Sequence, residues 1–100
     1  MILEDNPYGE LRFRGEDIPT FKSMDDEGIV IYNGSYSKVL SAGMRIGFVM
    51  AQKDVLQRLT VAKQFSDCHS NIFFQIVTDE WLRTADVDAH IAKIRKIYRD

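Results

Sequence analysis

The chain has 100 residues, in which 13 Lys and Arg face 15 Asp and Glu, so its formal net charge is −2. A chain of this length forms one domain at most, and its 45% hydrophobic and 28% charged residues are typical of a globular protein and exclude a disordered tail. The near-neutral charge argues against a dedicated nucleic-acid binder, and a single cysteine excludes an intramolecular disulfide and a cysteine-rich zinc site.

Short strands separated by turns are predicted for the first half of the chain. Residues 2–5 read as the end of a buried strand, and the apolar runs at 29–32 and 46–51 have strand length and a β-branched or aromatic bias. Turn residues cluster between these runs, as at 25–28 and 33–35. No run approaches the roughly 20 apolar residues that span a bilayer, and no signal peptide is visible, so we expect a cytoplasmic protein without membrane contact.

From about residue 52 onward, apolar residues recur at helical spacing and predict three successive helices. The first is about four turns long. Its apolar stripe consists of Val55, Leu56, Leu59 and Ala62. The second runs from 71 to about 84, with Ser70 or Asn71 available as its cap. Its apolar face consists of Ile72, Phe73, Ile76, Val77 and Trp81.

The third helix begins after Asp86, which is placed to cap it. Its inward face consists of Val87, Ile91, Ile94 and Tyr98. This stripe still continues at Tyr98 when the sequence stops, and a strand-like run begins at residue 2. We therefore expect residues 1–100 to be an excerpt of a larger protein, with both ends truncated.

A lysine lies just beyond the second predicted strand, after a Gly-Ser turn. In open α/β sheets, ligands bind in the crevice outside the carboxyl ends of the strands, where Lys38 is placed. The hydroxyls of Ser35 and Ser37 can donate to an anion, and Arg45 suits bidentate binding of a phosphate. Gly43 permits a turn that returns Arg45 beside Ser35. The alternative is a solvated lysine in a loop and an arginine at the start of a strand.

A carboxylate and a phenol form a second group near the start of the chain. Asp5 ends the first predicted strand, and Tyr8 follows three residues later. Pro7 restricts the residue before it to extended conformations, so the turn is stiff and holds both side chains in a fixed relation. Taken separately, an Asx-turn residue and a packing aromatic are the ordinary alternatives.

Together, Asp5-x-x-Tyr8, Ser35-x-Ser37-Lys38 and Arg45 resemble the motifs of fold-type I aminotransferases, the aspartate aminotransferase superfamily that uses pyridoxal 5′-phosphate (PLP). Residues 4–11 look most like the 2-aminoadipate and kynurenine aminotransferase branch, which includes the aminotransferase-like half of MocR-type regulators. The resemblance covers essentially the whole chain. It implies an α/β fold in which residues 1–100 form part of the PLP-binding large domain, with strands followed by three helices.

The resemblance also implies a role for each motif residue. Lys38 would form a Schiff base with the cofactor aldehyde and then carry protons during amino transfer. Asp5 would pair with the pyridine nitrogen and keep it protonated, so that the ring acts as an electron sink. Tyr8 would donate a hydrogen bond to the phenolic oxygen of the ring. The implied phosphate contacts are Ser35, Ser37 and Arg45.

The implied parent is a PLP-dependent transaminase, a homodimer that moves an amino group from an amino acid to a 2-oxo acid. A second interpretation is the effector domain of a MocR/GntR-type transcription regulator, in which the Lys38 Schiff base senses a ligand. Nucleic acid is a partner in that case alone. A third is an inactive structural fragment. A basic winged-helix domain upstream would identify the regulator.

Other chemically active residues are expected to have structural roles. Cys68 and His69 are adjacent and lack a third ligand at metal spacing, and residues 25–27 offer too few oxygen ligands for calcium, so we expect no metal site. His90 is expected on the surface of the third helix. Trp81 is expected in the core.

Overall fold

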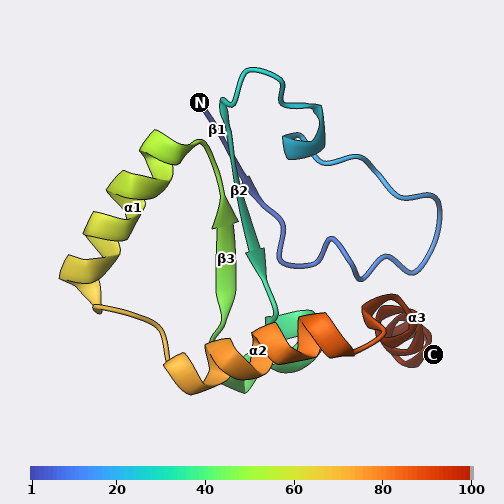
Figure 1. The fold of residues 1–100 in the computed structure, drawn as a ribbon. Coiled ribbons are helices and arrows are strands. Elements are labelled where there is room, and N and C mark those ends of the chain that lie inside the picture. The colour runs from blue at the N-terminus through green and yellow to red at the C-terminus, as the bar shows by residue number, and fades with distance from the viewer. Residues whose placement is uncertain (100) are drawn as a thin grey trace.

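The structure is a computed structural model that describes residues 1–99. It contains a three-stranded sheet followed by three α-helices (Figure 1). The strands are β1 (Ile2–Asp5), β2 (Val30–Ser35) and β3 (Gly47–Met50). The helices are α1 (Lys53–Ser66), α2 (Ile72–Thr84) and α3 (Val87–Arg99). The predicted order of strands followed by three helices is thus confirmed.

Strand β2 is the centre of the sheet, which has the order β1-β2-β3. It pairs in parallel with β1 and antiparallel with β3. The parallel pairing brings the carboxyl ends of β1 and β2 to the same edge of the sheet. The predicted turn at residues 33–35 is wrong, because these residues continue β2 and pair with β3. The chain instead turns after Ser35, so the candidate serine lies within the strand.

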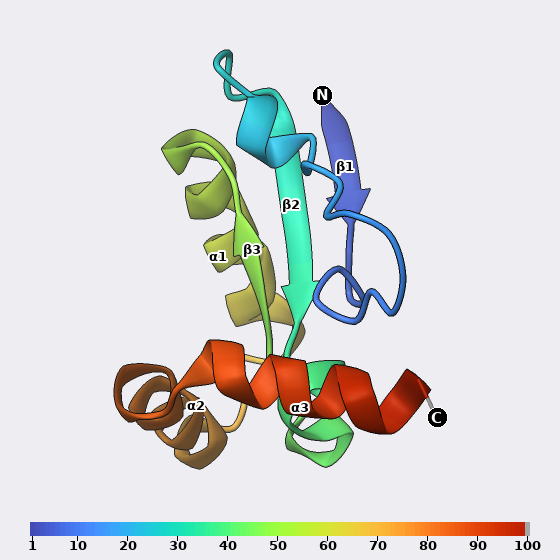
Figure 2. The same cartoon turned by 90° about the vertical axis from the view of Figure 1, so that its right-hand side faces the viewer.

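The two flanks of β2 are occupied by different parts of the chain. Helix α1 lies beside β3, the connection from β1 to β2 lies on the opposite side, and α2 and α3 cross the end at which β2 terminates (Figures 1 and 2). The predicted burial of β1 is wrong: Ile2 is 42% and Leu3 71% exposed, because β1 is an edge strand in this chain. None of the described helices is both long and apolar enough to cross a membrane.

An aromatic cluster joins β2 to β3. Phe48 lies opposite Gly34 in the register, and a side chain at Gly34 would collide with the Phe48 ring. The Phe48 ring centroid is 6.1 Å from that of Tyr32 and 5.3 Å from that of Tyr36. Burial raises the pKa of the Tyr36 phenol. Because Tyr36 directly follows β2, this packing fixes the point at which the chain leaves the sheet.

The helices agree with prediction in extent but only partly in orientation. Asn71 caps α2 as predicted, by accepting a hydrogen bond of 3.3 Å from Phe74 N. The predicted apolar face of α2 is wrong except at Trp81, since Phe73 is 67% and Ile76 63% exposed. The residues of α2 that turn inward are Phe74, Thr78 and Trp81. In α3 the predicted inward residues are half-buried except Tyr98, which is exposed.

The long connection between β1 and β2 is held by a network of charged groups. Both Glu4 carboxylate oxygens accept backbone hydrogen bonds, from Phe21 N at 3.0 Å and Lys22 N at 2.9 Å. The Lys22 ammonium lies 2.9 Å from the Asp25 carboxylate, whose side chain is 1% exposed. Burial alone would raise the pKa of Asp25, but Lys22 and two amides at the start of β2 outweigh it and lower the pKa to about 2. Asp25 is therefore a structural anion.

Candidate active site

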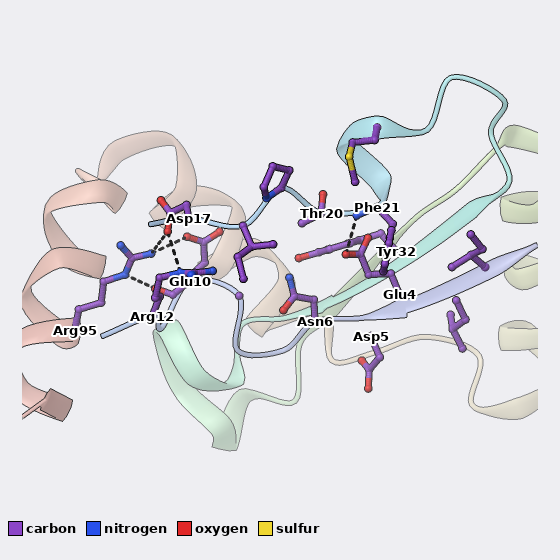
Figure 3. A pocket seen from close by; sticks show the side chains of 16 residues that line it. Glu4, Asp5, Asn6, Glu10, Arg12, Asp17, Thr20, Phe21, Tyr32 and Arg95 are labelled. Carbon is purple, nitrogen blue, oxygen red and sulfur yellow. Dashed lines mark hydrogen bonds and ion pairs between the residues drawn. The ribbon is translucent and has the colours of Figure 1, made fainter. Parts of the chain in front are cut away.

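Three polar side chains lie at the carboxyl ends of β1 and β2. Asp5 is opposite Asn33, whose Nδ2 donates a hydrogen bond of 2.8 Å to Asp5 Oδ1. Side chains alternate along a strand, so Ser35 extends from the same face as Asn33. Figure 3 shows Asp5 on the opposite side of β1 from Glu4 and Tyr32. The motifs do not predict the contact of Asn33, because it depends on the register between two strands.

A wide helical turn follows β2 and carries the candidate lysine. This π-helical turn spans Ser37–Ser41. The carbonyl oxygen of Tyr36 accepts hydrogen bonds from Leu40 N at 2.8 Å and Ser41 N at 3.2 Å. Ser37 N donates to Ser35 Oγ at 3.1 Å, which ties the start of the turn to the end of the strand. Lys38 is thus held just outside the carboxyl end of β2.

The structure brings Lys38 together with Tyr8. The Lys38 Nζ atom lies 5.0 Å from the centroid of the Tyr8 ring, within the range of a cation–π interaction. Lys38 is half-buried and Tyr8 is 58% exposed. Within residues 1–99, no carboxylate lies within ion-pair distance of the lysine. The amine is therefore left available for a ligand.

Arg45 returns to the same turn. Its NH1 lies 3.5 Å from Ser37 Oγ and 3.2 Å from the Ala42 carbonyl oxygen. Gly43 lies within the 3₁₀ turn Ala42–Met44 that returns Arg45, but the left-handed backbone belongs to Arg45 itself, with φ of 57°. Such a conformation is uncommon outside glycine and recurs at functional sites. The guanidinium contacts Ser37 Oγ, and the backbone amide of Ser37 donates a hydrogen bond to Ser35 Oγ.

The charges of this site are separated and unneutralised. We call the group formed by Asp5, Tyr8, Ser35, Ser37, Lys38 and Arg45 the lysine corner. Over the described part of the chain, neither Arg45 nor Asp5 forms an ion pair. Two cations beside two hydroxyls suit an anion, and a carboxylate steadied by an amide suits a cationic N–H. The lysine corner can therefore hold a ligand that carries an anionic group and a basic nitrogen.

A cavity of about 870 Å³ lies elsewhere, between β1 and the connection that follows it (Figure 3). Of the lysine corner, Asp5 alone lines it. Arg95 of α3 closes one end, with NH2 3.8 Å from Asp17 and 3.9 Å from Glu10. Arg12 Nε lies 3.5 Å from the same Asp17. These charges neutralise one another, so the cavity lacks the free cations of the lysine corner.

The prediction that His90 lies on the surface is wrong. His90 is half-buried, and its Nε2 lies 2.7 Å from the carbonyl oxygen of Val39. The edge of its ring meets Trp81 at a centroid distance of 5.4 Å. Cys68 is exposed, and residues 1–99 contain no cluster of three His, Cys, Asp or Glu side chains that could hold a metal ion.

No protein-family model matches the chain. The aromatic-amino-acid aminotransferase 1 of Thermococcus litoralis is 42% identical over 99 residues, covering 99% of this chain and 24% of that protein. An uncharacterized HTH-type transcriptional regulator of Bacillus subtilis, YisV, is 35% identical over 95 residues, covering 95% of this chain and 20% of that protein. The chain thus spans about a quarter or less of the length of these curated relatives.

Solved structures give the same answer for the fold. The structure of Pyrococcus horikoshii kynurenine aminotransferase, in complex with PMP, superposes on this chain with a TM-score of 0.95 at 38% identity. The match covers 99% of this chain and 24% of that one. The expected relationship to fold-type I aminotransferases and the α/β fold of their large domain are thereby confirmed.

Proposed function

We propose, starting from a chain whose sequence and fold match a segment of the fold-type I aminotransferases, that residues 1–100 form the later part of the PLP-binding large domain of a larger enzyme. The parent enzyme transfers an amino group reversibly from an amino acid to a 2-oxo acid. The observation that carries this proposal is the position of Lys38 Nζ, 5.0 Å from the Tyr8 ring, at the carboxyl ends of the strands. We further propose that the parent is a cytoplasmic homodimer.

The residues present fit the phosphate of PLP. Arg45 supplies a planar guanidinium already directed at Ser37, with 3.5 Å between NH1 and Oγ. Ser35 and Ser37 add two hydroxyls, and the hydrogen bond of 3.1 Å from the Ser37 backbone amide to Ser35 Oγ keeps the strand end and the turn together. A charge-assisted contact from arginine is about twice as strong as a neutral hydrogen bond. We assign the phosphate end of the cofactor to this side of the lysine corner.

The opposite side fits the ring of the cofactor. Asp5 Oδ1 is held by Asn33 at 2.8 Å, which leaves the second carboxylate oxygen free to accept a hydrogen bond from a protonated ring nitrogen. Tyr8, across the stiff turn at Pro7, offers its hydroxyl to the ring oxygen. When bound, PLP supplies an electron sink for the carbanion of the amino acid. Asp5 maintains that property by keeping the nitrogen charged.

Lys38 is the catalytic residue in this proposal. Its Nζ would hold the cofactor through the aldehyde carbon, with loss of water, and, once displaced by the amino acid, would take up and give back the proton of the substrate α-carbon. The Tyr8 ring attracts the protonated amine and keeps it within the corner. Holding the amine in this position replaces a random encounter by a fixed geometry.

A second candidate is the effector domain of a MocR-type regulator, which the 35% identity to YisV favours. The lysine corner would then capture the same cofactor, but the consequence would be a change in DNA binding by an upstream domain. Amino-donor turnover in a parent without such a domain supports the enzyme. Cofactor capture without turnover, in a parent with a winged-helix domain, supports the regulator.

The decisive experiment is to mix the full-length protein with PLP, reduce it with borohydride and locate the modified residue by mass spectrometry. We expect a single phosphopyridoxyl group on Lys38. A protein that stays unlabelled, or one labelled equally after Lys38→Ala, overturns the proposal and favours an inactive structural fragment.

A further inference from the structure

We propose that His90 is a positioning residue for Lys38, acting through the carbonyl group of Val39. The two residues are 51 positions apart in sequence, and His90 Nε2 lies 2.7 Å from Val39 O. Because a carbonyl oxygen only accepts hydrogen bonds, Nε2 must carry the proton and donate it. Helix α3 is thereby attached to the turn that bears the lysine, at the residue directly after it.

The carbonyl of Val39 is one that needs an external donor. It belongs to the π-helical turn Ser37–Ser41, and the last carbonyls of a helical segment lack donors within that segment. The backbone amides of Leu40 and Ser41 both donate hydrogen bonds to the carbonyl oxygen of Tyr36. Val39 is buried, at 9% exposure, so an unpaired carbonyl here would be shielded from water. His90 supplies the missing donor.

The histidine is itself held firmly. Asp86 caps α3 by accepting a hydrogen bond of 3.0 Å from Ala89 N, and His90 N donates to Asp86 O at 3.0 Å. Trp81 of α2 meets the imidazole at an interplanar angle of 81°, which restricts the ring from the other side. The ring is thus fixed between a helix start, an indole and the carbonyl it serves. A rigid donor of this kind fixes the peptide plane next to Lys38.

The effect of His90 on PLP capture by Lys38 rests on the proposed function, whereas its effect on the order of the Ser37–Ser41 turn does not. If the Val39 carbonyl is released, the turn gains freedom and Lys38 spends less time over Tyr8. We therefore expect loss of His90 to slow capture of PLP by Lys38 without removing any group that touches the cofactor. The turn should also exchange its amide hydrogens faster in protein free of cofactor.

The test uses the full-length protein and compares His90→Gln with His90→Asn. The glutamine amide places an N–H near the position of the imidazole Nε2, while asparagine is too short to reach Val39 O. We expect His90→Asn to accelerate amide exchange in the peptide covering residues 37–41, and to slow borohydride-trapped labelling of Lys38, each by about fivefold to thirtyfold. His90→Gln should recover most of both effects.

His69→Asn is the matched control, since His69 is exposed and its Nδ1 contacts the neighbouring Ser70 carbonyl oxygen at 2.9 Å. It should leave both measurements unchanged. Equal exchange and labelling in His90→Asn, His90→Gln and the unaltered protein overturn the positioning role. If the unaltered protein takes up no PLP, the proposed function fails, and the exchange comparison still decides whether His90 orders the turn.

Discussion

Glu4 and Asp5 are neighbours in β1, yet they belong to two regions with opposite electrostatic character. Glu4 faces the connection between β1 and β2, and both of its oxygens accept backbone hydrogen bonds. Asp5 faces the lysine corner, where it contacts a neutral amide and no cation within residues 1–99. In the first region the charged groups are satisfied by the fold, since backbone amides bind both oxygens of Glu4 and Lys22 pairs with Asp25. In the second they are held without partners, which is the arrangement that a charged ligand completes.

Lys38 in the lysine corner and Lys22 in the connection between β1 and β2 show the same contrast. Lys38→Ala gives the largest predicted effect. Lys38→Ala should lower transamination by the parent by more than about 10²- to 10⁴-fold, because it removes both the nucleophile and the proton carrier. Its thermal stability should change little, since Lys38 forms no ion pair in the described structure. Lys22→Ala should instead lower the thermal stability and change the transamination rate little, because Lys22 contacts Asp25 and Val30 O at 2.9 Å each. Steady-state kinetics and thermal melting of both variants measure the difference. Near-normal turnover in Lys38→Ala would contradict the assignment.

Arg45 tests the anionic side of the corner. Arg45→Ala should weaken retention of PLP by about 10- to 100-fold, the range for a hydrogen bond to a charged group, while changing the rate of the saturated enzyme less. Equilibrium dialysis against PLP measures the affinity. Arg83→Ala is the matched control, because Arg83 is exposed and, among residues 1–99, pairs only with Asp79 one helical turn away. Unchanged affinity in Arg45→Ala would refute its role at the phosphate.

The two adjacent carboxylates of β1, Asp5 and Glu4, allow a more direct comparison of the two regions. Asp5→Asn should lower turnover by about tenfold or more, the factor that corresponds to 1.4 kcal/mol, because an amide does not stabilise a protonated ring nitrogen. Glu4→Gln should instead lower stability, because it loses a charged acceptor for Phe21 N and Lys22 N. Kinetics and chemical denaturation of the two variants separate these outcomes. The same loss in both variants would show that the strand has no functional face.

The smallest effect concerns pH. Because the pKa of Asp25 is about 2 in the folded chain and lies below its ordinary value of 3.8, the unfolded chain binds more protons between these values. Asp25 therefore contributes stability above about pH 4 that is lost progressively as the pH falls towards 2. Denaturation of the full-length protein followed between pH 5 and 2 should show this loss, and Asp25→Asn should flatten it. An unchanged slope in that variant would argue that other carboxylates dominate.

The sequence predicts the lysine corner better than it predicts the packing. Parallel strands bring Asp5 and the residues after β2 to one edge by geometry alone, so the motifs suffice to place them. Burial is harder to predict, because hydrophobic periodicity identifies an apolar face without saying what covers it. Phe73 and Ile76 therefore look like core residues, although they are exposed in this chain. The contact of His90 with Val39 is beyond reach because it joins residues 51 positions apart.

The left-handed backbone of Arg45 makes this position a compromise between durability and affinity. Glycine adopts that conformation without steric cost, whereas a residue with a Cβ pays of the order of 1 kcal/mol or more. A protein engineer who selected for heat resistance alone would favour glycine at position 45. The resulting protein would tolerate higher temperatures and would lose the guanidinium beside Ser37. Thermostability screens of this family segment should therefore be run with the cofactor affinity as a second criterion.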